Sequence, residues 1–251
     1  MPKSKTTQSL LNTSVYKHRN LLKFCYFLLA FALLSCGNDT KTKNAGDANE
    51  NATTATETSE TTSNKTILFF GDSITAGYGL DDTNDAFPGI IQNKIDSLGL
   101  HYQVVNSGVS GETTAGGKSR IDWILNQDIE IFVLELGAND GLRGVPISET
   151  KANLQAIIDA VKAKSAAIKI VLAGMQLPPN MGADYTTQFK AIFSDLASEN
   201  NLAFIPFILK DVGGIAELNQ NDGIHPTAEG HKILAETVWE VVYPILVASE
   251  K

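Results

Sequence analysis

The chain has 251 residues, of which 43% are hydrophobic and 19% are charged. These fractions are typical of a globular protein with one good core, and they exclude a disordered or fibrous chain. The 20 basic and 28 acidic residues give a formal net charge of -8 at pH 7. Nucleic-acid binding needs a basic surface, so this acidic balance argues against a nucleic-acid partner.

Residues 1–35 are predicted to form an export signal. Basic residues precede the apolar stretch 24–34, and no acidic residue occurs before Cys36. The stretch is too short for a transmembrane span, which needs about 20 residues. It ends in Leu-Leu-Ser-Cys at 33–36, which resembles the lipobox of bacterial lipoproteins. That resemblance implies cleavage before Cys36 and lipid attachment to its sulfur; the alternative is a plain signal peptide with an incidental cysteine.

Residues 36–64 are predicted to be a lipidated cysteine followed by a disordered polar linker. The segment 37–64 contains no Ile, Leu, Val or aromatic residue, so it cannot bury enough apolar surface to offset its ordering entropy. Removal of the signal would leave 15 basic and 28 acidic residues, a formal charge of -13. We therefore expect an exported protein, anchored to a membrane of the bacterial cell envelope by its N-terminal lipid, with its folded domain at 65–251. In a Gram-negative cell this would be the periplasm or outer membrane.

From residue 65 onward, short β-rich runs alternate with helical patterns, which indicates parallel βαβ units. Together they predict an α/β protein in which helices on both faces enclose a five-stranded parallel sheet, a three-layer α/β/α sandwich. Pro244 is expected to kink or end the last helix. The predicted strands are 66–70, 102–106, 129–136, 168–172 and 203–205, and the predicted helices are 86–98, 117–126, 148–165, 185–200 and 227–243.

Three polar motifs directly follow the first three predicted strands. They are GDSIT at 71–75, a Ser- and Gly-containing loop at 107–113, and GANDG at 137–141. In an open parallel sheet, ligands bind beyond the carboxyl ends of the strands, where helix N-termini and loops converge. This coincidence points to a functional site at that edge of the sheet.

Ser73 in GDSIT is a candidate nucleophile, and His225 in DGIHP at 222–226 is its candidate base. A serine hydroxyl needs an imidazole within hydrogen-bond reach and a carboxylate to hold that imidazole in the right tautomer. Asp222 and His225 can meet through a tight turn, leaving Nε2 facing Ser73. Taken alone, Ser73 could instead cap a helix or turn. The other histidines lie in the signal, at the start of a strand and within the last helix: His18, His101 and His231.

Gly111 and Asn139 are candidate donors to a negatively charged oxygen on the substrate. Such an oxyanion is met by preorganised backbone N–H groups and Asn side chains. Gly111 would let the backbone approach a reacting carbonyl, although it could equally be a turn glycine and Gly108 is a similar neighbour. Asn139 could equally be a left-handed turn residue.

Taken together, these blocks resemble the SGNH (GDSL-type) hydrolase family, over about residues 65–243. Ser73 matches the nucleophile and one oxyanion donor, Gly111 and Asn139 match the other two donors, and Asp222 and His225 match the acid and base of the last block. The resemblance implies a flavodoxin-like α/β/α fold. The segments ELGANDGLRG at 135–144 and QLPPN at 176–180 further resemble the multifunctional periplasmic thioesterase, arylesterase and lysophospholipase branch.

That resemblance implies a serine esterase acting on acyl esters, thioesters or lysophospholipids with no metal and no organic cofactor. We expect an acyl-enzyme on Ser73, with Asp72 in a structural role. An apolar wall for the acyl chain is predicted on nearby loops. Two other functions remain open, a carbohydrate O-deacetylase on the same fold and a tethered lipid- or glycan-binding protein whose catalysis has lapsed. The predicted wall residues are Leu142, Leu177 and Pro178.

Overall fold

The structure, a computed structural model, describes residues 65–249. The predicted signal, the lipid-accepting Cys36 and the predicted linker lie outside the described residues, so these remain predictions. Among the residues that the structure describes, no helix has the length and apolar character needed to cross a bilayer.

Five parallel strands form one sheet in the order β2-β1-β3-β4-β5, which confirms the predicted sheet and has the flavodoxin-like order. Its central strands are almost wholly apolar because both faces are covered. In β1, residues 67–70 are completely buried. The strands are β1 (Lys65–Gly71), β2 (Tyr102–Gly108), β3 (Ile131–Glu135), β4 (Lys169–Ala173) and β5 (Ala203–Ile205).

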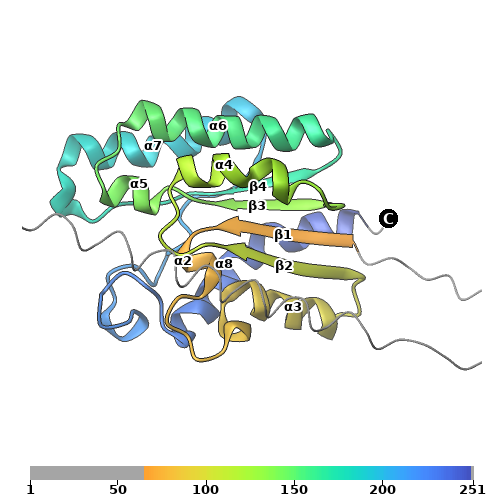
Figure 1. The fold of residues 1–251 in the computed structure, drawn as a ribbon. Coiled ribbons are helices and arrows are strands. Elements are labelled where there is room, and N and C mark those ends of the chain that lie inside the picture. Colours follow the sequence, from red (N-terminus) through yellow and green to blue (C-terminus); the bar gives the residue numbers. More distant parts are fainter. Residues whose placement is uncertain (1–64, 250–251) are drawn as a thin grey trace, which may run out of the picture. The chain divides into compact units, whose positions relative to one another are not determined.

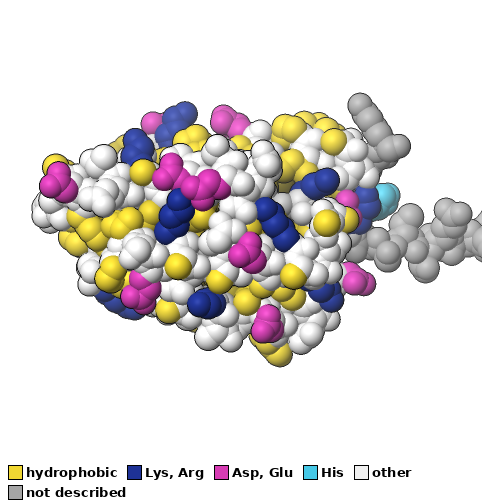
Figure 2. Space-filling view, turned by 90° about the horizontal axis from the view of Figure 1, so that it is seen from above, with side chains coloured by type: hydrophobic (Ala, Val, Ile, Leu, Met, Phe, Trp, Pro, Cys, Tyr) yellow, Lys and Arg dark blue, Asp and Glu magenta, His cyan; other side chains and the backbone are white. Residues whose placement is uncertain are grey.

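Two layers of helices enclose the sheet, which confirms the three-layer sandwich (Figure 1). Helices α3 (Phe87–Ser97) and α8 (Ala228–Ala248) cover one face. The other face is covered by α4 (Thr114–Ile124), α6 (Ile147–Lys164) and α7 (Ala183–Asn200). Over this second layer, Lys and Arg side chains alternate with Asp and Glu, without a large patch of one sign (Figure 2).

The first turns after β1 and β3 are short helices that the sequence pattern did not predict. These are α2 (Ser73–Ala76) and α5 (Ala138–Leu142). Four or five residues are too few to show a helical period. Single-turn 3₁₀ helices also occur in the connecting loops: η1 (Thr83–Asp85), η2 (Pro179–Met181) and η3 (Ala216–Leu218).

Helix α4 begins three residues earlier than predicted, and α8 continues beyond Pro244. The Thr113 hydroxyl caps α4 by accepting from the Gly116 N–H, which extends the helix through its glycines. In α8, Pro244 removes only the bond to the carbonyl of the exposed Glu240. Burial of Leu246 in the core beyond the proline favours continuation of the helix to Ala248.

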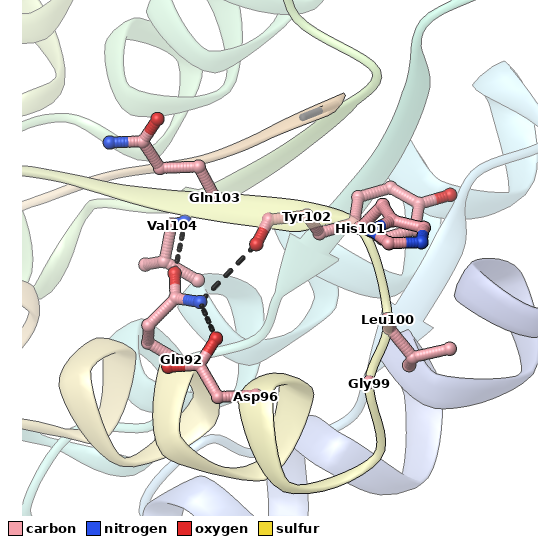
Figure 3. A pocket seen from close by; sticks show the side chains of 8 residues that line it. All are labelled: Gln92, Asp96, Gly99, Leu100, His101, Tyr102, Gln103 and Val104. Atoms are coloured by element: carbon pink, nitrogen blue, oxygen red, sulfur yellow. Dashed lines mark hydrogen bonds between the residues drawn. The ribbon is translucent and has the colours of Figure 1, made fainter. Parts of the chain in front are cut away.

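Gln92 caps the free edge of β2 (Figure 3). Its amide donates to the Tyr102 carbonyl at 3.2 Å and accepts from the Val104 N–H at 2.6 Å. These are the two bonds that a further parallel strand would make, so Gln92 protects an edge that is otherwise open to strand pairing. A shallow cavity of about 510 Å³ lies beside it.

Helices α3 and α8 are joined by a buried histidine. His231 accepts from the Phe87 N–H at 3.2 Å through Nδ1, which satisfies a backbone donor at the start of α3 that has no partner within the helix. Burial, followed by the charge of His225, lowers the pKa of His231 from 6.5 to about 4. His231 is therefore neutral and structural at pH 7.

This pKa predicts a loss of stability in acid. Between pH 6.5 and pH 4 the unfolded chain binds a proton at His231 that the folded chain excludes, so stability decreases as the pH falls through this window. The contribution lost is about 3 kcal/mol. Urea unfolding should be compared between the wild type and His231→Gln, which keeps an acceptor but does not titrate. Over this pH window the free energy of unfolding of the wild type should decrease by that amount relative to the variant. An equal pH dependence in both proteins would contradict the assignment.

Candidate active site

Strand register brings the three predicted motifs to one place. Gly71 at the end of β1 pairs with Gly108 of β2 on one side and with Glu135 of β3 on the other. All three strands therefore end at the same level, and the segments that follow them converge at this edge of the sheet (Figure 1). This is the crevice between β1 and β3 where the chain order reverses, the usual ligand position in such sheets.

Ser73, His225 and Asp222 form a hydrogen-bonded chain. Ser73 is the first residue of α2, and its Oγ lies 2.9 Å from Nε2 of His225. The other ring nitrogen, Nδ1, lies 2.7 Å from Oδ2 of Asp222. The structure thus brings together the three residues predicted as nucleophile, base and orienting acid, although 152 positions separate Ser73 from His225. This arrangement can activate a serine hydroxyl for attack on a carbonyl carbon.

Asp222 is held as a carboxylate by its own turn. The hydrogen bond with His225, followed by the bond from the Ile224 N–H, lowers the pKa of Asp222 to about 2. Its Oδ1 accepts from the N–H groups of Ile224 and His225 at 3.0 and 3.1 Å. The ring of Tyr78 packs against the imidazole, with 4.6 Å between centroids. Asp222 therefore remains an acceptor for Nδ1–H throughout the neutral pH range.

Beneath the nucleophile lie two buried carboxyl groups. Asp72 Oδ1 caps α2 by accepting from the Ile74 N–H at 3.0 Å, as expected for a structural residue. Burial raises the pKa of Asp72 to about 6, against the lowering effect of its bonds from Ile74 and Asn139. Burial, and then the Asp72 charge, raise the pKa of Glu135 well above its ordinary value. Glu135 accepts from the Thr75 hydroxyl at 2.7 Å and so joins the end of β3 to α2.

The two candidate oxyanion donors lie on the loops after β2 and β3. Gly111 has φ of 78°, and an added Cβ there would meet only the Arg143 guanidinium, at 3.8 Å. In contrast, a Cβ on Gly108 would lie 2.2 Å from the backbone nitrogen of Ala76. The structure therefore distinguishes the two glycines, because Gly108 packs against α2 whereas Gly111 faces open space. Gly111 is the one that can approach a ligand.

Both amide hydrogens of Asn139 are engaged in this structure. Nδ2 donates to the Glu112 carbonyl at 3.0 Å and to Asp72 Oδ2 at 3.2 Å. The side chain is thereby fixed beside the nucleophile turn, and Asn139 is in a right-handed helical turn rather than the left-handed turn considered from sequence. An oxyanion can receive a hydrogen bond from Asn139 only if one of these two bonds is shared or released.

A cleft of about 420 Å³ opens beside the Ser73 hydroxyl. Leu142, Leu177 and Pro178, the three predicted wall residues, all line it. Sequence reasoning missed most of the remaining wall, because those residues come from loops far apart in the chain. Apolar lining that it missed includes Ile74, Met175, Phe207, Leu209 and Ile224. Among residues 65–249, no group of three or more His, Cys, Asp or Glu side chains is placed to hold a metal ion.

Glu112 and Glu135 are further polar residues of the site that sequence reasoning did not single out. Glu135 did carry a signal, since it is an acidic residue at the end of an otherwise apolar strand. Glu112 carried none, because an acidic residue in a polar loop is normally solvated.

A Ser-His-Asp chain at the carboxyl edge of a flavodoxin-like sandwich, open to an apolar cleft, defines the class of protein as a serine hydrolase. A family model described as the GDSL-like Lipase/Acylhydrolase family matches residues 69–233. The chain belongs to this family.

Similar proteins are known from several bacteria. The chain is 39% identical to the "Esterase TesA" of Pseudomonas aeruginosa, over 72% of this chain and 90% of that protein. It is 35% identical to the "Thioesterase 1/protease 1/lysophospholipase L1" of Escherichia coli strain K12, over 72% of this chain and 85% of that protein. A crystal structure of TesA has a TM-score of 0.68 and 38% identity, over 72% of this chain and 99% of that chain. The chain is a hydrolase that acts on ester bonds.

Proposed function

We propose that the protein hydrolyses acyl esters and thioesters through an acyl-enzyme on Ser73. The observation that carries this proposal is the chain of hydrogen bonds from Asp222 through His225 to the Ser73 hydroxyl, which faces the apolar cleft. A hydroxyl bonded to Nε2 of a neutral imidazole can lose its proton to that nitrogen as it attacks a carbonyl carbon.

The reaction has two halves that use the same groups. In the first, Ser73 Oγ attacks the ester carbonyl while His225 Nε2 takes its proton and then gives it to the leaving alcohol or thiol. In the second, His225 takes a proton from water, the hydroxide attacks the acyl carbon, and the proton returns to Ser73. Asp222 stabilises the imidazolium that forms in each half by accepting from Nδ1–H.

The oxyanion of each tetrahedral intermediate is held by three donors in this mechanism: the N–H groups of Ser73 and Gly111 and the amide of Asn139. The Ser73 N–H lies in the first turn of α2, where the helix itself provides no acceptor. Asn139 would turn to the oxyanion the N–H that bonds Asp72 at 3.2 Å and would keep its bond to the Glu112 carbonyl at 3.0 Å. This exchange replaces a bond made in the resting state with one made in the transition state.

The cleft favours an acyl chain longer than acetyl. Its lining near the nucleophile is dominated by apolar side chains from α2, α5 and the loops after β4 and β5. The names of the similar proteins, esterase, thioesterase and lysophospholipase, are consistent with fatty acyl substrates. A carbohydrate O-deacetylase would need little apolar surface beside its serine, so the wall of the cleft favours the acyl esterase.

We also propose that the domain is exported and anchored in the cell envelope by a lipid on Cys36. The support is the sequence alone: the apolar stretch 24–34 follows basic residues and ends at a lipobox-like Cys36. Cells expressing the full chain should incorporate labelled palmitate into it, and Cys36→Ser should abolish the label. Equal labelling of the variant would contradict this proposal.

Ser73→Ala should abolish nearly all hydrolysis of p-nitrophenyl butyrate without unfolding the protein, because it removes one oxygen, from a residue that lines the cleft, whose side-chain hydrogen bond is to His225. Steady-state rates and thermal unfolding of the purified variant test this. Ser194→Ala, an exposed serine on α7 that bonds only the Ala191 carbonyl, is the matched control and should keep wild-type rates. A fully active Ser73→Ala would rule out the mechanism.

The ratio kcat/KM should rise with acyl length, from acetyl upward, until the cleft is filled. Each methylene buried is worth about 0.8 kcal/mol, roughly a fourfold change. p-Nitrophenyl esters and acyl thioesters of graded length, compared with acetylated sugars, provide the measurement. A preference for acetylated sugars over every longer ester would instead establish the deacetylase.

A further inference from the structure

Arg120 on α4 binds Glu112 in the loop that carries Gly111. We refer to residues 109–113 as the oxyanion loop. Arg120 Nε lies 2.7 Å from one carboxylate oxygen of Glu112, and Nη2 lies 2.6 Å from the other. Only 19% of the Arg120 side chain and 7% of the Glu112 side chain are exposed. Two parallel charge-assisted bonds of this kind fix both distance and direction.

The same guanidinium also joins the oxyanion loop to the ends of two strands. Nη1 donates to the Ser107 hydroxyl and Nη2 to the Ser107 carbonyl, both at 2.9 Å, at the end of β2. The guanidinium carbon lies 3.9 Å from the centre of the Phe70 ring in β1, a cation–π contact. A planar group with five donors is suited to such a multiple role, which an ammonium group is not.

Glu112 in turn is connected to both candidate oxyanion donors outside the nucleophile turn. Gly111 immediately precedes it in the chain, and the Glu112 N–H donates to the Val109 carbonyl at 3.1 Å, which closes the turn that contains Gly111. The Glu112 carbonyl accepts from Asn139 Nδ2 at 3.0 Å. The ion pair therefore anchors the segment to which both donors are attached, together with Arg143, which donates to the Gly111 carbonyl at 3.0 Å, and Asp72, which accepts from Asn139 at 3.2 Å.

The ion pair is expected to contribute little to the stability of the fold. Desolvation of two nearly buried charges offsets most of their attraction, and well-packed apolar residues in such places are often as stable or more stable. Donors to an oxyanion, in contrast, must be held close to their productive geometry by the residues behind them. The geometry is therefore better suited to precise placement than to stabilisation.

We propose that Arg120 and Glu112 are positioning residues that hold the oxyanion hole in its active geometry. Neither touches the substrate; they act through Gly111 and Asn139. The inference rests on the proposed acyl transfer at Ser73, and it adds to that mechanism two residues to which the sequence motifs assign no role.

The test compares binding of a transition-state analogue with binding of a ground-state ligand. An alkyl trifluoromethyl ketone accepts the Ser73 oxygen at its carbonyl carbon and leaves an oxyanion, while the proton passes to His225. The unfluorinated methyl ketone with the same alkyl chain is neutral and does not add the serine to an appreciable extent, so it binds without forming an oxyanion. Arg120→Lys keeps the charge but loses the planar set of donors, and Glu112→Gln keeps the shape but loses the charge. Lys118→Met removes a cation from the same helix and is the matched control.

In both variants kcat should fall roughly tenfold to a hundredfold, less than the hundredfold to thousandfold typical of deleting one oxyanion donor. The inhibition constant of the trifluoromethyl ketone should rise by the same factor, while KM and the inhibition constant of the methyl ketone change less than threefold. Lys118→Met should match the wild type in all four quantities.

Two results would overturn the proposal. One is a folded variant whose kcat and inhibition by the trifluoromethyl ketone match the wild type. The other is an equal loss of affinity for the trifluoromethyl ketone and for the methyl ketone, as a merely structural role would give. If Arg120→Lys does not fold, Ser107→Ala removes only one of its bonds and should change kcat and affinity for the trifluoromethyl ketone together, by a smaller factor. A wild-type protein that neither hydrolyses the ester nor binds the trifluoromethyl ketone would overturn the proposed function itself.

Discussion

The parallel pairing of β1 with both β2 and β3 is the constraint on which the site depends. Because Gly71 is level with Gly108 and with Glu135, the chain leaves three adjacent strands at one height. The segments after β1 and β3 form the short helices α2 and α5, and the segment after β2 forms the oxyanion loop. A change of register in either pairing would move a donor away from Ser73 by about one residue rise, 3.3 Å, which is more than a hydrogen bond tolerates.

Beneath this edge the protein buries an unusual number of carboxyl groups. Asp72 and Glu135 lie under the nucleophile turn with raised pKa values, and Glu112 lies beside them with its arginine. Burying such groups reduces stability unless they are paired or protonated. They serve the site rather than the core. Asp72 accepts from the nucleophile turn and from Asn139, Glu135 accepts from the nucleophile turn, and Glu112 joins the oxyanion loop to α4. This is where the fold departs most from simple apolar packing.

The main features of the fold and site follow from local patterns in the sequence. Apolar runs that alternate with helical patterns predict the five parallel strands. GDSIT has a serine directly after the first strand, and DGIHP has a histidine three residues after an acid in a loop, a combination that favours catalysis. Short helices such as α2 and α5 could not be predicted, because they are too short to show a helical period. The continuation of α8 past Pro244 could not be predicted either, because it depends on burial of Leu246 in the core. Glu112 and Arg120 were not found because partners eight residues apart, across a loop and a helix, show no sequence signature.

The central claim, that the ester's acyl group passes through a covalent bond to Ser73, is tested most directly by trapping that intermediate. The purified protein would be mixed with a slowly hydrolysed acyl ester, quenched in acid within the first turnover, and analysed by mass spectrometry of the intact chain and of its peptides. We expect one added acyl group on the peptide that contains Ser73, formed before the steady state and absent in Ser73→Ala. Full turnover with no adduct, or with the acyl group on another residue, would contradict it.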